Sequence, residues 1–227
     1  MRLRKAYKQE KIILFVQKNL AELIGVILGD GSLGVYKRQG RKCRQFRLKI
    51  TLNSEKDFDY SKYVSALIKD VLKIKPYRYK RKNEKTLDLI ITNKQAVKKL
   101  IEIGLHESPK WNNAVIPAKF LRRDLSLLVM RGYMDTDGCI SVFDNNGIIY
   151  PRIEMKICPS PMQAQFIRIL EENGFSPRVN DIGNGKVRIM LAGVKKLRKW
   201  NNTIGFSNKR NSDIANRFIK KDSGGWI

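Results

Sequence analysis

The chain has 227 residues, enough to bury a substantial core as one large or two small domains. Its 46 Lys and Arg outnumber 21 Asp and Glu, and the net charge of +25 favours a nucleic-acid partner over a membrane surface. One histidine and three cysteines without CxxC spacing exclude a zinc finger and a ββα-metal nuclease. No apolar run approaches the ~20 residues of a membrane span and no targeting segment is evident, so we expect a cytoplasmic protein.

The first predicted element is an apolar helix that follows a basic lead-in and ends at Asp30-Gly31. Within the stretch LIGVILGDGS, Gly25 and Gly29 are one helical turn apart. A glycine inside a helix costs ~1 kcal/mol relative to alanine. Small residues at this spacing share one face and let a second helix approach closely. The stretch therefore predicts a tightly packed helix with a carboxylate at its C-terminal end.

A basic β-hairpin is predicted over residues 35–49, turning at Gln39-Gly40, with no acidic residue in it. Apolar Phe46 and Leu48 alternate with polar residues in its second half. This alternation is typical of a strand that packs one face on helices and offers the other to phosphates and bases. The expected DNA contacts in this hairpin are Lys37, Arg38, Arg41, Lys42, Arg44, Gln45, Arg47 and Lys49.

A helix over about 54–72, a second hairpin over 77–92 and a helix over 94–103 follow. The second hairpin alternates aromatic and basic residues in its first strand. We expect Arg78 and Lys80 to extend the cationic face as DNA contacts. Tyr77 and Tyr79 are then expected to pack in the core.

Residues 106–117 have the character of a linker, and a second apolar helix follows with the sequence MRGYMDTDGCI. Here Gly132 and Thr136 take the small positions, and the stretch ends in Asp137-Gly138. If the two helices pack together, Asp30 and Asp137 lie side by side at adjoining C-terminal ends. Mutual repulsion and the negative ends of both helix dipoles disfavour this arrangement. A divalent cation would relieve both problems, and hard oxygen ligands suit Mg²⁺.

The pattern of the first half then recurs. Strands are predicted near 140–144 and 149–157, a helix from Pro161 to Gly174, a hairpin over 178–191 and helices over 194–202 and 211–220. The outward residues of these strands are expected to contact DNA, and they are Arg152, Glu154, Lys156 and Arg188.

An internal duplication is visible in the spacing of these elements. Asp30 and Asp137 are 107 positions apart, as are Lys49 and Lys156, and the sequence VKKL at 97–100 recurs at 194–197. The duplication predicts an α+β fold of two pseudo-symmetric αββαββα repeats, with the two apolar helices on the pseudo-twofold axis and two antiparallel four-stranded sheets. The expected limits are 1–110 for the first repeat with its lead-in, 111–122 for a linker and 123–227 for the second repeat.

The paired stretches LIGVILGDG and RGYMDTDG resemble the signature helices of single-chain LAGLIDADG homing endonucleases, although Leu28 and Gly29 depart from the first motif. The resemblance implies a saddle of sheets over the DNA major groove and an intron-encoded monomer that cuts double-stranded DNA at a long asymmetric site. It implies no small-molecule substrate and no membrane. Asp30 and Asp137 would hold Mg²⁺, with Mn²⁺ as a substitute and the carbonyls of Gly29 and Thr136 as further ligands. The family also places a lysine late in each repeat, which matches Lys110 and Lys209 as catalytic candidates.

Two alternatives stay open. Asp144 followed by Glu154-Met155-Lys156 fits the loose pattern of a PD-(D/E)xK nuclease, although that assignment ignores the repeat. The same fold also serves as an RNA maturase or a DNA-binding regulator. Retention of both acids favours the nuclease.

Overall fold

The computed structural model describes residues 2–37, 40 and 43–223. Both halves have their first seven elements in the same order, and the second half adds a final helix. The first half comprises α1 (Arg2–Asp30), β1 (Gly31–Lys37), β2 (Arg44–Asn53), α2 (Phe58–Leu72), β3 (Tyr77–Lys80), β4 (Thr86–Ile91) and α3 (Lys94–Glu102). After a 3₁₀ turn at Ala118–Phe120, the second half comprises α4 (Arg123–Met134), β5 (Gly138–Asn145), β6 (Ile148–Ile157), α5 (Met162–Glu172), β7 (Arg178–Asp181), β8 (Val187–Ala192), α6 (Val194–Thr203) and α7 (Lys209–Ser223). The predicted α+β fold is confirmed.

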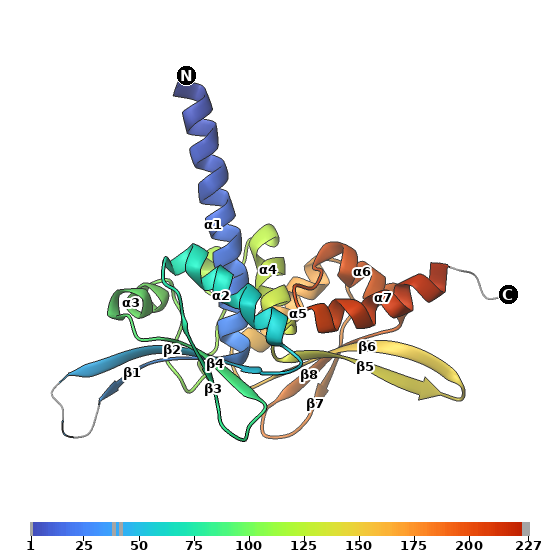
Figure 1. The fold of residues 1–227 in the computed structure, drawn as a ribbon. Helices are drawn as coiled ribbons and strands as arrows, with labels where there is room; N and C mark the ends of the chain where they lie inside the picture. The colour runs from blue at the N-terminus through green and yellow to red at the C-terminus, as the bar shows by residue number, and fades with distance from the viewer. Residues whose placement is uncertain (1, 38–39, 41–42, 224–227) are drawn as a thin grey trace.

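The eight strands form two antiparallel sheets with matching orders, β1-β2-β4-β3 and β5-β6-β8-β7. The helices lie on one side of both sheets, and the β1–β2 and β5–β6 hairpins extend to opposite ends of the molecule (Figure 1). The opposite faces of the sheets are free of helices in this view. We call the helix-free side of the two sheets the groove face.

The α1 and α4 helices cross at the centre of the molecule, and they approach at the small residues that the sequence singled out. A Cβ atom added to Gly25 would lie 2.0 Å from the carbonyl oxygen of Val129, and one added to Gly132 would lie 2.2 Å from that of Glu22. A Cβ atom on Gly29 would lie 2.0 Å from Thr136 Oγ1. The prediction of a close helix pair is therefore confirmed, and no side chain fits at these glycines.

The basic lead-in is not a separate segment but the beginning of α1, which starts at Arg2. Figure 1 shows this part of the helix projecting away from the sheets, on the side opposite the groove face. Leu14 and Phe15 are exposed on it, whereas the residues from Ala21 to Gly29 are fully buried. Only the second half of α1 therefore belongs to the core.

Candidate active site and nucleic-acid interface

Asp30 ends α1, and Asp137 follows the turn that ends α4, so the helix crossing brings the two carboxylates together. Burial, and after it the charge of Asp137, raises the pKa of Asp30 to about 7. Partial burial also raises the pKa of Asp137, and the Lys110 ammonium opposes that shift. Each pKa moves in the direction expected for carboxylates that lack a full counter-charge. The pair is therefore an incompletely neutralised acidic centre at the middle of the molecule.

Lys110 inserts its side chain into this centre from the segment that joins the two halves. Its Nζ atom donates to the carbonyl oxygen of Leu28 at 2.7 Å and also to that of Gly29. Burial lowers the pKa of Lys110, while the charges of Asp137 and Asp30 oppose the shift. The structure thus places this predicted catalytic lysine beside both acids. The Gly29 carbonyl, an expected metal ligand, already accepts a hydrogen bond from it.

The second predicted lysine lies elsewhere. Lys209 pairs with Asp213, one turn further along α7, and its side chain is 74% exposed. The next residue, Arg210, contacts Asp57 Oδ1 at 3.3 Å, and its charge lowers the pKa of Asp30. Arg210, one position after the predicted Lys209, is therefore the basic residue of this segment whose charge acts on Asp30. Counting from the repeated Ile-Gly pair could not separate the two residues, because the segments after that pair differ in length.

A buried polar network on the other side of the helix pair explains the position of Arg210. Asp135 accepts hydrogen bonds from the backbone nitrogens of Ser207 at 2.6 Å and Asn208 at 3.0 Å, just before α7. Asn208 Nδ2 in turn donates to Asp57 Oδ1 at 2.8 Å. Burial raises the pKa of Asp135 to about 6, and these hydrogen bonds oppose that shift. The network fixes the start of α7 against α4 and α2.

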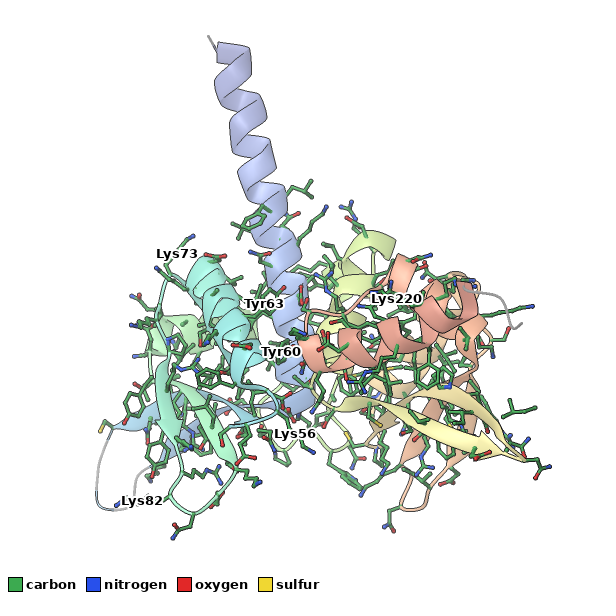
Figure 2. The ribbon with its side chains drawn as sticks, turned by 45° about the vertical axis from the view of Figure 1, so that its right-hand side comes forward. Lys56, Tyr60, Tyr63, Lys73, Lys82 and Lys220 are labelled. Carbon is green, nitrogen blue, oxygen red and sulfur yellow. The ribbon has the colours of Figure 1, made fainter. Side chains whose placement is uncertain are left out.

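The same network continues to the helices around α1. Glu22, which is 1% exposed, pairs with Arg131 of α4 and accepts from Ser207 Oγ at 2.5 Å. Tyr60 and Tyr63 of α2 lie where α1, α2 and α7 meet (Figure 2). The first copy of the motif has apolar Leu28 where the second has Asp135. A hydrogen-bond network like the one at Asp135 therefore cannot form at the equivalent position of the first copy.

Strand register decides which predicted contacts lie on the groove face of the first sheet. Leu48 and Ile50 of β2 are buried under the helices, so the alternating residues Gln45, Arg47 and Lys49 take the groove face. The Arg47 guanidinium lies 4.6 Å from the centre of the Tyr36 ring, which holds it on that face. This matches the expectation for β2.

The second sheet presents Arg152, Glu154 and Lys156 on its groove face, because Ile153 and Ile157 are buried on the other. The Arg152 guanidinium packs 3.8 Å from the centre of the Phe143 ring and donates to Tyr150 Oη at 2.9 Å. Arg188 of β8 is paired in register with Lys156 and shares this face. Two cationic surfaces therefore flank the acid pair, one on each sheet.

Two expectations for β3 are wrong in the same way. Tyr77 and Tyr79 are 65% and 45% exposed and stack on each other, rather than packing in the core. Arg78 instead turns to the helices, where its Nη2 donates to Ser61 Oγ at 2.7 Å. Lys80 shares the register face of Arg78. The strand alternates as predicted, but its aromatic residues take the groove face and its basic residues the helix side.

The remaining DNA-contact predictions fall at the end of the β1–β2 hairpin. Lys37 and Arg44 are register partners on the face that carries Phe46, so they do not share the face of Arg47. Arg38, Arg41 and Lys42 lie outside the described residues.

The geometry does not support a PD-(D/E)xK site. Asp144 accepts a hydrogen bond from Gly147 N at 2.8 Å, within the turn of the β5–β6 hairpin. Its register partner is Ile149, five residues from Glu154 along β6, which is about 16 Å at the rise of a strand. The two acids also point to opposite faces. Glu154 is instead paired with Arg152 at 3.5 Å.

Within the described residues, His, Cys, Asp and Glu side chains do not gather in a group of three or more that could hold a metal ion. A metal at the acid pair would therefore rest on two carboxylates and on non-acidic donors. No helix in the described part of the chain is long and apolar enough to cross a membrane.

Comparison with solved structures finds the same fold in homing endonucleases. The chain is similar to I-DmoI in complex with DNA and Mn, with 19% identity, coverage of 85% of this chain and 98% of the other, and a TM-score of 0.58. It is also similar to I-LtrWI bound to target DNA, with 12% identity, coverage of 92% of each chain and a TM-score of 0.62. I-SmaMI bound to uncleavable DNA shares 11% identity over 88% of each chain, with a TM-score of 0.60.

A search of curated proteins finds no match to the chain. The family comparison is decisive, since the model of the LAGLIDADG DNA endonuclease family matches residues 21–193, which hold both signature helices and both sheets. The crossed helices with their paired acids and that match together show that this chain belongs to the LAGLIDADG DNA endonuclease family.

Proposed function

We propose that this chain is a site-specific DNA endonuclease that hydrolyses both strands of a long asymmetric target with Mg²⁺. The observation that carries the proposal is the meeting of Asp30 and Asp137 at the ends of two crossed helices, between two cationic sheet faces. Both acids come from one chain, so a monomer is sufficient. The two repeats with limits 1–110 and 123–227 then each read one half of an asymmetric target.

The donor set at the centre fits a hard divalent cation. Two carboxylates with raised pKa values lack a full counter-charge, and Mg²⁺ prefers oxygen ligands of this kind. Asp30 and Asp137 would hold the ion, with the carbonyls of Gly29 and Thr136 as further ligands. When bound, the ion supplies a Lewis acid and lowers the pKa of a coordinated water. The solved I-DmoI structures contain Mn, Ca or Mg, which supports a divalent metal in this fold.

The two cations beside the acids have distinct roles in this proposal. Lys110 is held against the carbonyls at the end of α1, where its ammonium can donate to an oxygen of the scissile phosphate. Arg210 is held by Asp57 on the other side of Asp30. Cations fixed in advance stabilise the extra charge that forms on phosphorus during hydrolysis. Each strand would thus be cut beside a different cation.

Binding is assigned to the groove face of the two sheets. Its cations are Arg47, Lys49, Arg152, Lys156 and Arg188. The Nε atoms of Arg47 and Arg188 are buried and have no hydrogen-bond partner among the described residues. Buried donors are normally paired. Because these two atoms are inaccessible to solvent, an acceptor from outside the chain would reach them only after the side chains turn toward the DNA. Phosphate oxygens and base edges both provide such acceptors.

The proposed activity is tested by selecting cleaved duplexes from a randomised DNA library with the purified protein and Mg²⁺. We expect one family of related targets, cleaved on both strands, and no cleavage in the presence of a chelator. Glu154→Gln should leave cleavage intact because Glu154 pairs with Arg152 and is not one of the two paired acids. Binding of a defined duplex without any cleavage under Mg²⁺ would instead support a DNA-binding regulator.

Affinity for the selected duplex should fall steeply with salt. Five groove-face cations that each neutralise one phosphate predict a slope of about −4.5 in a plot of log K against log salt concentration. Lys156→Ala should reduce the slope by about one. Lys73, at the far end of α2 from the sheets (Figure 2), provides the matched control, and Lys73→Gln should leave the slope unchanged. A flat plot would contradict the assignment of the groove face to DNA.

Replacing Lys110 and replacing Lys209 should have sharply different effects, and Arg210 is tested beside them. Lys110→Met should lower the cleavage rate by roughly 100-fold or more, since it removes a fixed donor to the phosphate. Lys209→Met should stay within about 2-fold of wild type, since its side chain pairs with Asp213 on the surface. Single-turnover cleavage with bound duplex measures all three, and Arg210→Lys tests Arg210 while keeping its charge. Equal losses for Lys110→Met and Lys209→Met would refute this placement.

A further inference from the structure

A hollow of about 570 Å³ opens beside Asp137, between the linking segment and the turn that joins β7 to β8. Its lining includes Asp137, Lys110, Trp111, Lys156 and Lys186. Lys156 lies on the groove face, so the hollow opens toward the surface to which we assign DNA binding. We propose that Trp111 stacks on a nucleotide of the strand cleaved at the Asp137 side of the centre. This inference rests on the proposed function, and it adds a substrate contact that exists on one side only.

The backbone around Trp111 is firmly held. The preceding residue, Lys110, is tied to the end of α1 by its ammonium. Asn112 N donates to the Pro159 carbonyl oxygen at 2.6 Å, just after β6, and Ala114 N donates to the Lys110 carbonyl oxygen at 2.9 Å. The indole therefore projects from a turn that is fixed on both sides of it. A rigid aromatic side chain loses little conformational freedom when a ligand stacks on it.

The indole of Trp111 is exposed to an unusual degree. It is 41% exposed, whereas Trp200 of α6 is fully buried. The Lys186 ammonium lies 5.1 Å from the centre of the Trp111 ring. An aromatic ring with one ammonium group over it matches a nucleotide, which offers the flat face of a base and the negative charge of a phosphate. A phosphate near Lys186 and Lys156 would place the adjoining base against the indole.

The second repeat does not provide this contact. If Arg210 is the counterpart of Lys110, the counterpart of Trp111 is Asn211. Asn211 is 1% exposed, and its Nδ2 atom donates to Asp135 Oδ1 at 2.9 Å. It is part of the buried network and cannot reach DNA. The two strands of the target therefore meet different surfaces beside the acid pair.

The test measures the cleavage rate of each strand separately. It uses the duplex recovered by the library selection, with a distinguishable label on each strand. Trp111→Ala should slow cleavage of one strand by about 10- to 100-fold, the loss expected for one stacked base, and leave the other within about 3-fold. Nicked duplex should then accumulate. Trp111→Phe should restore most of the rate, because an aromatic face remains. Phe15→Ala removes an exposed aromatic ring from the projecting part of α1, and it should change neither rate.

A second measurement replaces the nucleotides beside the slowly cleaved bond, one at a time, with an abasic analogue. One of these duplexes should slow wild-type cleavage as much as Trp111→Ala does, and it should add no further loss in that variant. Equal slowing of both strands, or no slowing of either, would overturn the inference while leaving the endonuclease proposal intact. A selection that returns no cleaved duplex would overturn the endonuclease proposal and this inference with it.

Discussion

Asp30→Asn and Asp137→Asn should each abolish cleavage of both strands while the protein stays folded and bound to DNA. Either change removes a carboxylate from a pair that shares the metal, so we expect a loss of more than about 100-fold in rate. Each also removes a negative charge near the DNA phosphates. Affinity for the selected duplex without metal should therefore hold or rise slightly. Single-turnover cleavage and metal-free binding measure the two effects separately.

Asp30→Asn should also stabilise the metal-free protein above neutral pH. The pKa of Asp30 is raised to about 7 from 3.8, so the folded state holds the proton more tightly than the unfolded chain does. The stability that protonated Asp30 contributes to the folded protein is therefore lost as pH rises from about 4 to 7. The shift corresponds to at most about 4 kcal/mol. At roughly 2–4 °C per kcal/mol, Asp30→Asn should unfold several degrees above wild type at pH 8 and close to it at pH 4.

Thermal unfolding in a chelating buffer at both pH values tests this expectation. Lower stability of Asp30→Asn at pH 8 would show that the carboxylate is already neutralised within the chain. Loss of DNA binding in parallel with cleavage, at unchanged unfolding temperature, would argue that these acids are not the metal site.

Gly25→Ala and Gly132→Ala should each destabilise the protein strongly. The added methyl group would lie 2.0 Å from the Val129 carbonyl oxygen or 2.2 Å from that of Glu22, and backbone atoms cannot move aside without separating α1 from α4. We expect a cost of about 3 kcal/mol, which outweighs the ~1 kcal/mol that alanine gains in a helix. The unfolding temperature should fall by roughly 10 °C. Cleavage should also fall, because the helix spacing sets the distance between the acids.

Gly147→Ala is the matched control for these two variants. Gly147 lies in the β5–β6 turn with φ of +83°, and nothing lies within 4 Å of an added Cβ atom. Only the backbone conformation opposes the change, at a cost of about 1–2 kcal/mol. Unfolding of Gly25→Ala at the temperature of Gly147→Ala would show that the helix pair relaxes more easily than the packing indicates.

The sequence by itself determined the elements and the acid pair. Glycines one turn apart are costly in a helix unless a neighbouring backbone approaches, so LIGVILGDG and RGYMDTDG predicted the α1–α4 contact. Both stretches end in an acid, which fixed Asp30 and Asp137 at adjoining helix ends. Alternation in β2 and β6 also identified their cationic face, because their apolar residues can only pack under the helices.

Only the tertiary structure decided which side a short, exposed strand presents. In β3 the tyrosines lie on one face and the basic residues on the other, and this alternation does not say which face packs against the helices. The choice follows from Ser61 and Ser65 of α2, which accept hydrogen bonds from the Arg78 guanidinium. Arg210 and Trp111 were likewise beyond sequence reasoning. Their positions depend on where Asp135 and Pro159 anchor two irregular segments, and hydrogen bonds between segments distant in the chain leave no period in the sequence.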